Sequence, residues 1–205
     1  MKLSENRAAR WTALIIVSLT MMFAYFFTDV MSPLEPLLTA ASEAENGMGL
    51  GWTSSEYGFF SGAYGLMNVY LLLLFFGGIF LDKFGIRFTG LMSTGLMFCG
   101  AFIKWYALQG DFEGSMWVPF GGECQMQVVV ASLGFAIYGV GAEIAGITVS
   151  KVIVKWFTGH ELALALGLQV ALARIGTAVA LGASLPIARA FGGVSAPVAL
   201  GAALL

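Results

Sequence analysis

Long stretches without charge dominate this chain and restrict what it can fold into. Runs of about 20 apolar residues match the hydrocarbon core of a bilayer, which is about 30 Å thick. Hydrophobic residues make up 59% of the chain and charged residues 11%, whereas a soluble domain carries about 25% charged residues. A chain of 205 residues cannot hide that much apolar surface in one water-soluble core. The pattern therefore predicts an all-α membrane protein in a lipid bilayer.

The apolar runs divide the chain into five complete spans and a partial sixth. The fourth and fifth are longer than a straight crossing requires, so we expect them to tilt or protrude. The sixth stops at Leu205 inside an apolar run, and truncation is the simplest explanation. We expect one transmembrane bundle over residues 1–205, with spans at about 11–32, 56–81, 88–108, 126–156, 162–190 and 195–205, the last incomplete.

Charge alternates between the connections. Loops 35–55 and 109–125 are acidic, and the connections between them are basic. Lysine and arginine accumulate on the cytoplasmic side of membrane proteins, so we expect a cytoplasmic N-terminus. Lys104 and Arg189 fall near outer ends and are exceptions. The basic residues behind this orientation are Lys2, Arg7, Arg10, Lys83, Arg87, Lys151 and Lys155.

A glycine-rich charged turn lies between the second and third spans. It contains Gly78, Asp82, Lys83, Gly85 and Arg87. The order and placement resemble the signature loop of the major facilitator superfamily, which latches the cytoplasmic side in one conformation. The alternative is a charged turn that only obeys the positive-inside rule.

Three ionisable residues fall within the spans: Asp29, Glu143 and Arg174. Each is costly in lipid, so each should face a cavity or a partner. Glu143 and Arg174 lie at similar depths on antiparallel spans joined by a short turn. They could form a structural salt bridge, or they could clamp a zwitterion, with the acid on an ammonium and the guanidinium on a carboxylate.

Polar and small residues recur at helical spacing on four spans. These stripes predict a cavity shared by spans one, two, four and five, with the third peripheral. For the glycines alone, close helix packing is the preferred interpretation. The stripes are Ser18, Met22, Tyr25 and Asp29; Tyr57, Ser61, Tyr64 and Asn68; Ala136, Gly139, Glu143, Gly146 and Ser150; and Gly167, Ala171, Arg174 and Ala178.

A wider resemblance covers nearly all of the chain. The segments 25–29, 139–143, 156–157, 161–169 and 173–176 are similar to the lysosomal dipeptide transporter branch of the superfamily. The resemblance implies the N-terminal six-helix half of a twelve-helix fold that works by alternating access, with a missing C-terminal half or a partner half. It also implies solutes with free amino and carboxyl ends, such as dipeptides. The substrate-binding residues would be Glu143, Arg174, Tyr25, Tyr64, Asn68 and Gln169.

Two departures qualify the resemblance. The N-terminus has no acidic-dileucine sorting signal, which favours the plasma (inner) membrane of a bacterium over a lysosome. The fourth span lacks the arginine of proton-coupled drug exporters. Proton coupling through Asp29 or Glu143 stays open, because a desolvated carboxylate can titrate near neutral pH.

Other classes of function find little support. The chain has no hydrolase elbow, zinc-protease motif or phosphate loop, so we expect no enzyme, cofactor or metal site. It has no basic arm for nucleic acid. His160 is expected to be a loop residue, and Cys99 and Cys124 to be structural. Two alternatives remain: a transporter of another organic anion or sugar acid through Arg174 alone, and a non-transporting membrane subunit.

Overall fold

The computed structural model describes residues 6–41, 48–70, 72–109, 112, 116–117, 123–157 and 159–205. The helices are α1 (Arg7–Asp29), η2 (Ser32–Leu34), α2 (Glu35–Thr39), α3 (Ser54–Tyr70), α4 (Leu73–Gln109), α5 (Met126–Trp156), α6 (His160–Phe191) and α7 (Ser195–Leu204). A two-residue hairpin, β1 (Met116–Trp117) with β2 (Cys124–Gln125), lies just before α5. The predicted all-α class is confirmed, and the count of six spans stays a prediction.

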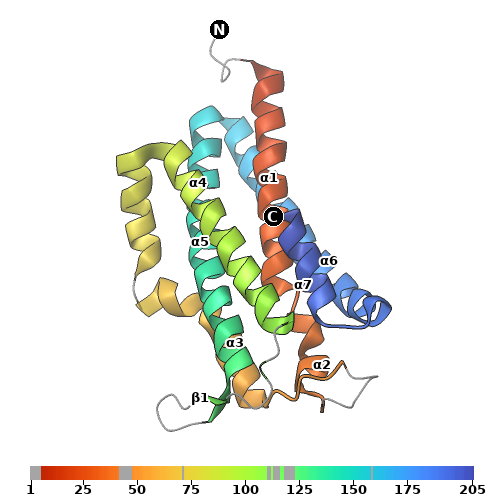
Figure 1. Cartoon of the computed structure of the whole chain (residues 1–205). Coiled ribbons are helices and arrows are strands. Elements are labelled where there is room, and N and C mark those ends of the chain that lie inside the picture. The colour runs from red at the N-terminus through yellow and green to blue at the C-terminus, as the bar shows by residue number, and fades with distance from the viewer. Residues whose placement is uncertain are drawn as a thin grey trace.

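Four helical segments are long and apolar enough to cross a membrane. They are Arg7–Thr39, Phe75–Gln109, Met126–Trp156 and Glu161–Phe191, and Ser195–Leu204 is a shorter apolar helix. Such a set of helices is the pattern of a multi-pass membrane protein. In Figure 1, α1, α5, α6 and the later part of α4 form the bundle, with α7 beside α1 and α6.

The predicted second span is divided in the structure. Helix α3 ends at Tyr70, and α4 begins at Leu73 after Leu72, which has φ 50°. Helix α4 then bends at Gly85, where φ 78° and ψ 174° interrupt the helix. Only glycine adopts this conformation readily, so Gly85 makes the turn between two arms of α4. Figure 1 shows the second arm running beside α5.

Glycines let the helices approach closely. A methyl group on Gly134 of α5 would lie 2.6 Å from the backbone nitrogen of Lys104, and one on Gly141 would lie 2.7 Å from that of Met97. Gly139 packs against the carbonyl of Tyr64 in the same way, and Gly176 against that of Met22. These contacts join α5 to α4 and α3, and α6 to α1, as small residues do in membrane bundles.

Helix α3 begins with a capping arrangement, at the lower end of the molecule in Figure 1. The carboxylate of Glu56 accepts hydrogen bonds from the backbone nitrogen and the hydroxyl of Thr53, at 2.8 and 2.9 Å. The Thr53 hydroxyl in turn accepts from the backbone nitrogen of Glu56 at 3.2 Å, which completes a capping box. The second oxygen of Glu56 accepts from the backbone nitrogen of Gln125 at 2.7 Å. One buried acid therefore holds the start of α3 to the strand before α5.

Candidate functional site

A pocket of about 180 Å³ opens between the end of α1, α3 and α5. Three residues of the predicted second-span stripe line it, and Asp29 from the first-span stripe joins them. Of the four stripes predicted to share a cavity, the second and the end of the first reach this pocket, and the stripe residues of the fourth and fifth spans do not line it. The pocket is lined by Thr28, Asp29, Met31, Ser32, Tyr57, Phe60, Ser61, Tyr64 and Phe135.

Glu143 is connected to this pocket through Tyr64. The Tyr64 hydroxyl donates a hydrogen bond to Oε1 of Glu143 at 2.9 Å. Glu143 itself is half-buried on α5 and does not line the pocket. The tight contact of Gly139 with the Tyr64 backbone brings α3 close enough for this bond. The acid predicted to bind solute is thus held by a neutral phenol.

Arg174 lies on an exposed face of α6. Its guanidinium carbon is 5.5 Å from the centre of the Tyr25 ring, a cation–π distance. Glu143 and Arg174 form no ion pair with each other in the described residues, whose ion pairs lie elsewhere. Glu143 contacts Tyr64 and Arg174 contacts Tyr25, so neither charge neutralises the other.

Asp29 joins the pocket to α6. The Thr177 hydroxyl donates a hydrogen bond to Oδ2 of Asp29 at 2.7 Å. Asn68 and Gln169 are not brought to the pocket. The amide of Asn68 is buried, and neither its nitrogen nor its oxygen has a hydrogen-bond partner in the structure. Gln169 is buried on α6, 9% exposed.

The predicted gating turn lies at the opposite end of the helices from the pocket. Asp82 pairs with Lys151 of α5, with Nζ 2.5 Å from Oδ1. Lys83 lies 5.6 Å from the centre of the Phe84 ring, and Arg87 is exposed. Gly78 is half-buried in the first arm of α4.

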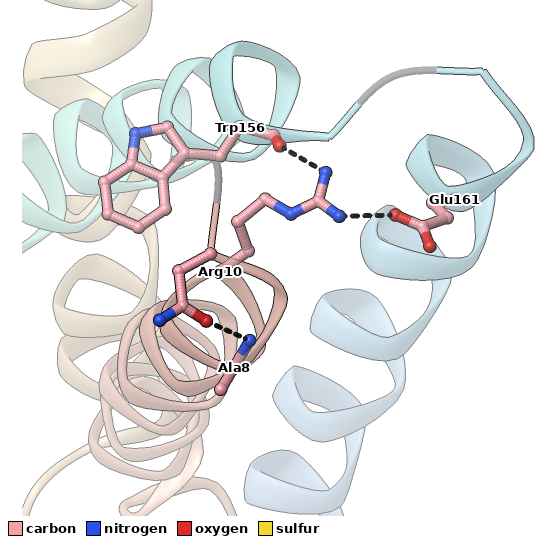
Figure 2. Close-up of polar contacts among 5 residues, drawn as sticks. Ala8, Arg10, Trp156 and Glu161 are labelled. Atoms are coloured by element: carbon pink, nitrogen blue, oxygen red, sulfur yellow. Dashed lines mark hydrogen bonds and ion pairs between the residues drawn. The ribbon is translucent and has the colours of Figure 1, made fainter. Parts of the chain in front are cut away.

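Arg10 of α1 contacts the end of α5 and the start of α6, and the sequence did not indicate these contacts. Figure 2 shows its guanidinium between the end of α5 and the start of α6. Nη2 lies 3.3 Å from Oε2 of Glu161, and Nη1 donates to the carbonyl of Trp156 at 3.5 Å. The guanidinium carbon is also 5.6 Å from the centre of the Phe157 ring. In the sequence Arg10 stands directly before a membrane span, a place that indicates only the orientation of the chain.

Lys104 was also missed as a site residue. It is fully buried, and its ammonium nitrogen donates to the carbonyl of Phe27 at 3.3 Å. Its position near the end of a span suggested a charge in the flank of the membrane. The rings of Phe27, Phe60 and Phe135, which lie near its ammonium, are distant in sequence and give no local signal.

The described residues were also compared with the requirements of a metal site and of a disulfide. In the described residues, no cluster of three or more metal-ligating side chains occurs. Cys99 is exposed and Cys124 buried, and both are free thiols. The side chain of His160 lies outside the described residues.

Comparison with known proteins identifies relatives of about half of the chain. A stretch of 110 residues is 33% identical to the lysosomal dipeptide transporter MFSD1 of Bos taurus, covering 53% of this chain and 20% of that protein. The similarity to lysosomal dipeptide transporters is confirmed over this stretch. The Homo sapiens protein is 32% identical over the same share of each chain, and the Danio rerio protein 29%, with 21% of its length covered.

The match is limited in extent. It spans about one fifth of the length of these relatives. No family model matches the chain, and no solved structure does. The relatives are named as dipeptide transporters, and this name applies to those proteins.

Proposed function

We propose that this chain is the N-terminal half of a major-facilitator-type secondary transporter for small solutes with free amino and carboxyl ends, dipeptides above all. In this proposal the chain has no enzymatic activity. A C-terminal half, or a partner half, would complete the bundle and close the cavity. The protein would lie in the inner membrane of a cell with its N-terminus in the cytoplasm, as the basic connections suggest.

The observation that carries the proposal is the unneutralised pair of charges on α5 and α6. Glu143 lies 14 residues before Phe157 and Arg174 lies 14 residues after His160, so both stand about 21 Å from the intervening turn. Charges at this depth are rarely retained without a function. Their recorded partners, Tyr64 and Tyr25, orient them without cancelling them.

Binding would use both ends of the solute. Glu143 would accept the ammonium, and the guanidinium of Arg174 would fork onto the carboxylate. Tyr25 and Tyr64 would hold the two charged groups in place, and the pocket beside Tyr64 would receive part of the solute. Asn68 has an amide with free hydrogen-bonding capacity, and Gln169 would complete the cavity wall when the second half is present.

Transport would follow alternating access around this site. The turn at Gly78, Asp82, Lys83, Gly85 and Arg87 would latch the cytoplasmic side, with the pair between Asp82 and Lys151 as its closing contact. Lys151 lies 16 residues beyond Phe135 of the pocket, about 24 Å along α5. Proton coupling, where the transporter uses it, would fall to Asp29 or Glu143.

The experiment is uptake of a solute panel by the complete gene product in proteoliposomes. The panel contains a neutral dipeptide, its N-acetyl and C-amide derivatives, a free amino acid and a sugar acid. We expect uptake of the dipeptide, with a KM at least tenfold higher when either end is blocked. Glu143→Gln should remove the discrimination against the N-acetyl derivative, and Arg174→Ala that against the amide.

Two outcomes contradict this proposal. Intact dipeptide uptake in Glu143→Gln together with its loss in Arg174→Ala would favour an organic anion held by Arg174 alone. No uptake of any solute by wild-type protein that is folded and correctly inserted would favour a non-transporting membrane subunit.

A further inference from the structure

Lys104 places its side-chain amino group in the interior of the bundle. Its side chain is 0% exposed, and Gly134 of α5 packs against its backbone nitrogen. An ammonium group has three donors, and the recorded acceptor is the Phe27 carbonyl at 3.3 Å. Burying a charge is costly unless other groups compensate for the lost water. The surroundings of Lys104 must therefore supply that compensation.

Three aromatic rings surround the Lys104 ammonium. Its nitrogen lies 4.2 Å from the ring centre of Phe135, 4.4 Å from that of Phe27 and 5.5 Å from that of Phe60. The rings come from α5, α1 and α3. Cation–π contacts of this kind gain strength when the cation is desolvated. The rings stabilise the charge, but they carry no net negative charge of their own.

Two of these three rings also form part of the wall of the pocket. Phe60 and Phe135 line the pocket and also contact the Lys104 ammonium. Asp29, two residues after Phe27 on α1, lines the same pocket. The wall that contacts the Lys104 ammonium therefore belongs to the same pocket as the Asp29 carboxylate. Among the described residues, no carboxylate forms an ion pair with Lys104.

We propose that Lys104 is the counter-charge of Asp29 and sets the charge selectivity of the pocket, as a positioning residue that acts through the Phe60 and Phe135 wall. This inference rests on the proposed transport function. Asp29 with Lys104, and Glu143 with Arg174, form two balanced sets of charges. A balanced cavity favours a zwitterion without net charge. Loss of Lys104 leaves one excess negative charge, which favours a cationic solute instead.

The test compares Lys104→Met, Asp29→Asn and the double variant in the complete gene product. Uptake is measured for a neutral and a lysine-containing dipeptide, and the readout is the ratio of KM for the cationic solute to KM for the neutral one. We expect Lys104→Met to lower this ratio about tenfold and Asp29→Asn to raise it. The double variant should return to within threefold of wild type. Lys155→Met, on the exposed end of α5, should leave the ratio unchanged.

An unchanged ratio in Lys104→Met, or no return in the double variant, overturns the proposal. If Lys104→Met does not accumulate as folded protein, accumulation of the double variant supports the charge pairing, and its absence overturns it. If the wild-type protein transports no dipeptide, the proposed function fails separately. The pairing then stands or falls on thermal melting, where the two substitutions should be non-additive, with the double variant more stable than Lys104→Met.

Discussion

The hydroxyl of Tyr64 donates a hydrogen bond to the carboxylate of Glu143 across 2.9 Å, from α3 to α5. This bond connects the pocket wall to one of the two charges proposed to hold the solute. Its removal should leave the carboxylate present but free to turn away. A hydrogen bond to a charged group contributes about 1.5–3 kcal/mol.

Tyr64→Phe should therefore raise the KM for dipeptide about tenfold, with a maximal rate close to that of wild type. The reason is that the phenyl ring keeps its packing against Phe135 while the donor is lost. Uptake kinetics in proteoliposomes measure this. Tyr70→Phe is the matched control, because Tyr70 is 80% exposed. A KM within twofold of wild type in Tyr64→Phe would exclude the orienting role.

Arg174→Lys should lose at least 90% of kcat/KM for dipeptide even though the charge is kept. Lysine cannot fork onto a carboxylate, and it does not present a planar group to the Tyr25 ring. Arg7→Lys, at the exposed start of α1, provides the control. Full activity in Arg174→Lys would mean that charge alone suffices, and the fork would be abandoned.

Gly100→Ala should lower the melting temperature of the purified protein by about 5 °C. The added methyl would overlap the backbone nitrogen of Tyr138 and the carbonyl oxygen of Gly134, so α4 and α5 must separate. Overpacking of this kind costs about 1–3 kcal/mol. Gly95→Ala has open space around its methyl and should not destabilise the protein. Equal melting temperatures for the two variants would contradict the close packing.

Glu56→Ala should destabilise the protein by about 2 kcal/mol. The substitution removes the acceptor of three hydrogen bonds, two from Thr53 and one from Gln125, and leaves their donors without it. Thermal melting again provides the measurement, and Glu56→Gln should be milder. Glu123→Ala changes an exposed acid nearby and should melt like wild type. A melting temperature of Glu56→Ala close to that of wild type would show that the capping box is dispensable.

Asp82→Asn should slow transport while it leaves the melting temperature nearly unchanged. The side chains of Asp82 and Lys151 are 81% and 40% exposed, and such a pair contributes less than about 1 kcal/mol to stability. Its effect should appear in the conformational cycle instead. The exchange Asp82→Lys with Lys151→Asp should recover part of the lost rate. A fall in rate without recovery by the exchange would assign the role to Asp82 itself.

The apolar runs and the polar stripes were readable from the sequence because helical periodicity is local. Asp29, Tyr57, Ser61 and Tyr64 meet at one pocket, as the stripes indicated. Glycines of α5 pack against neighbouring backbones, and close helix packing was the interpretation preferred for the glycines of the stripes. The bend at Gly85 also lies within the turn that the motif marked.

Contacts between distant segments were not readable in the same way. The cage around Lys104 joins residues from four helices, and no spacing in the sequence brings Phe27, Phe60 and Phe135 together. The break between Tyr70 and Leu73 falls in a run of leucines that gives no stop signal. Glu143 and Arg174 contact tyrosines and not each other because of the directions of their side chains. The depth of a residue along a helix does not determine that direction.

Arg10 has a mechanical consequence for any movement of the bundle. Its single guanidinium holds the final carbonyl region of α5 at Trp156 and the first turn of α6 at Glu161, while its own backbone belongs to α1. Three helix ends therefore meet at one guanidinium, and to separate α1 from either of the other two, the ion pair or the hydrogen bond must break. A movement of the bundle that kept both contacts would carry the three ends together.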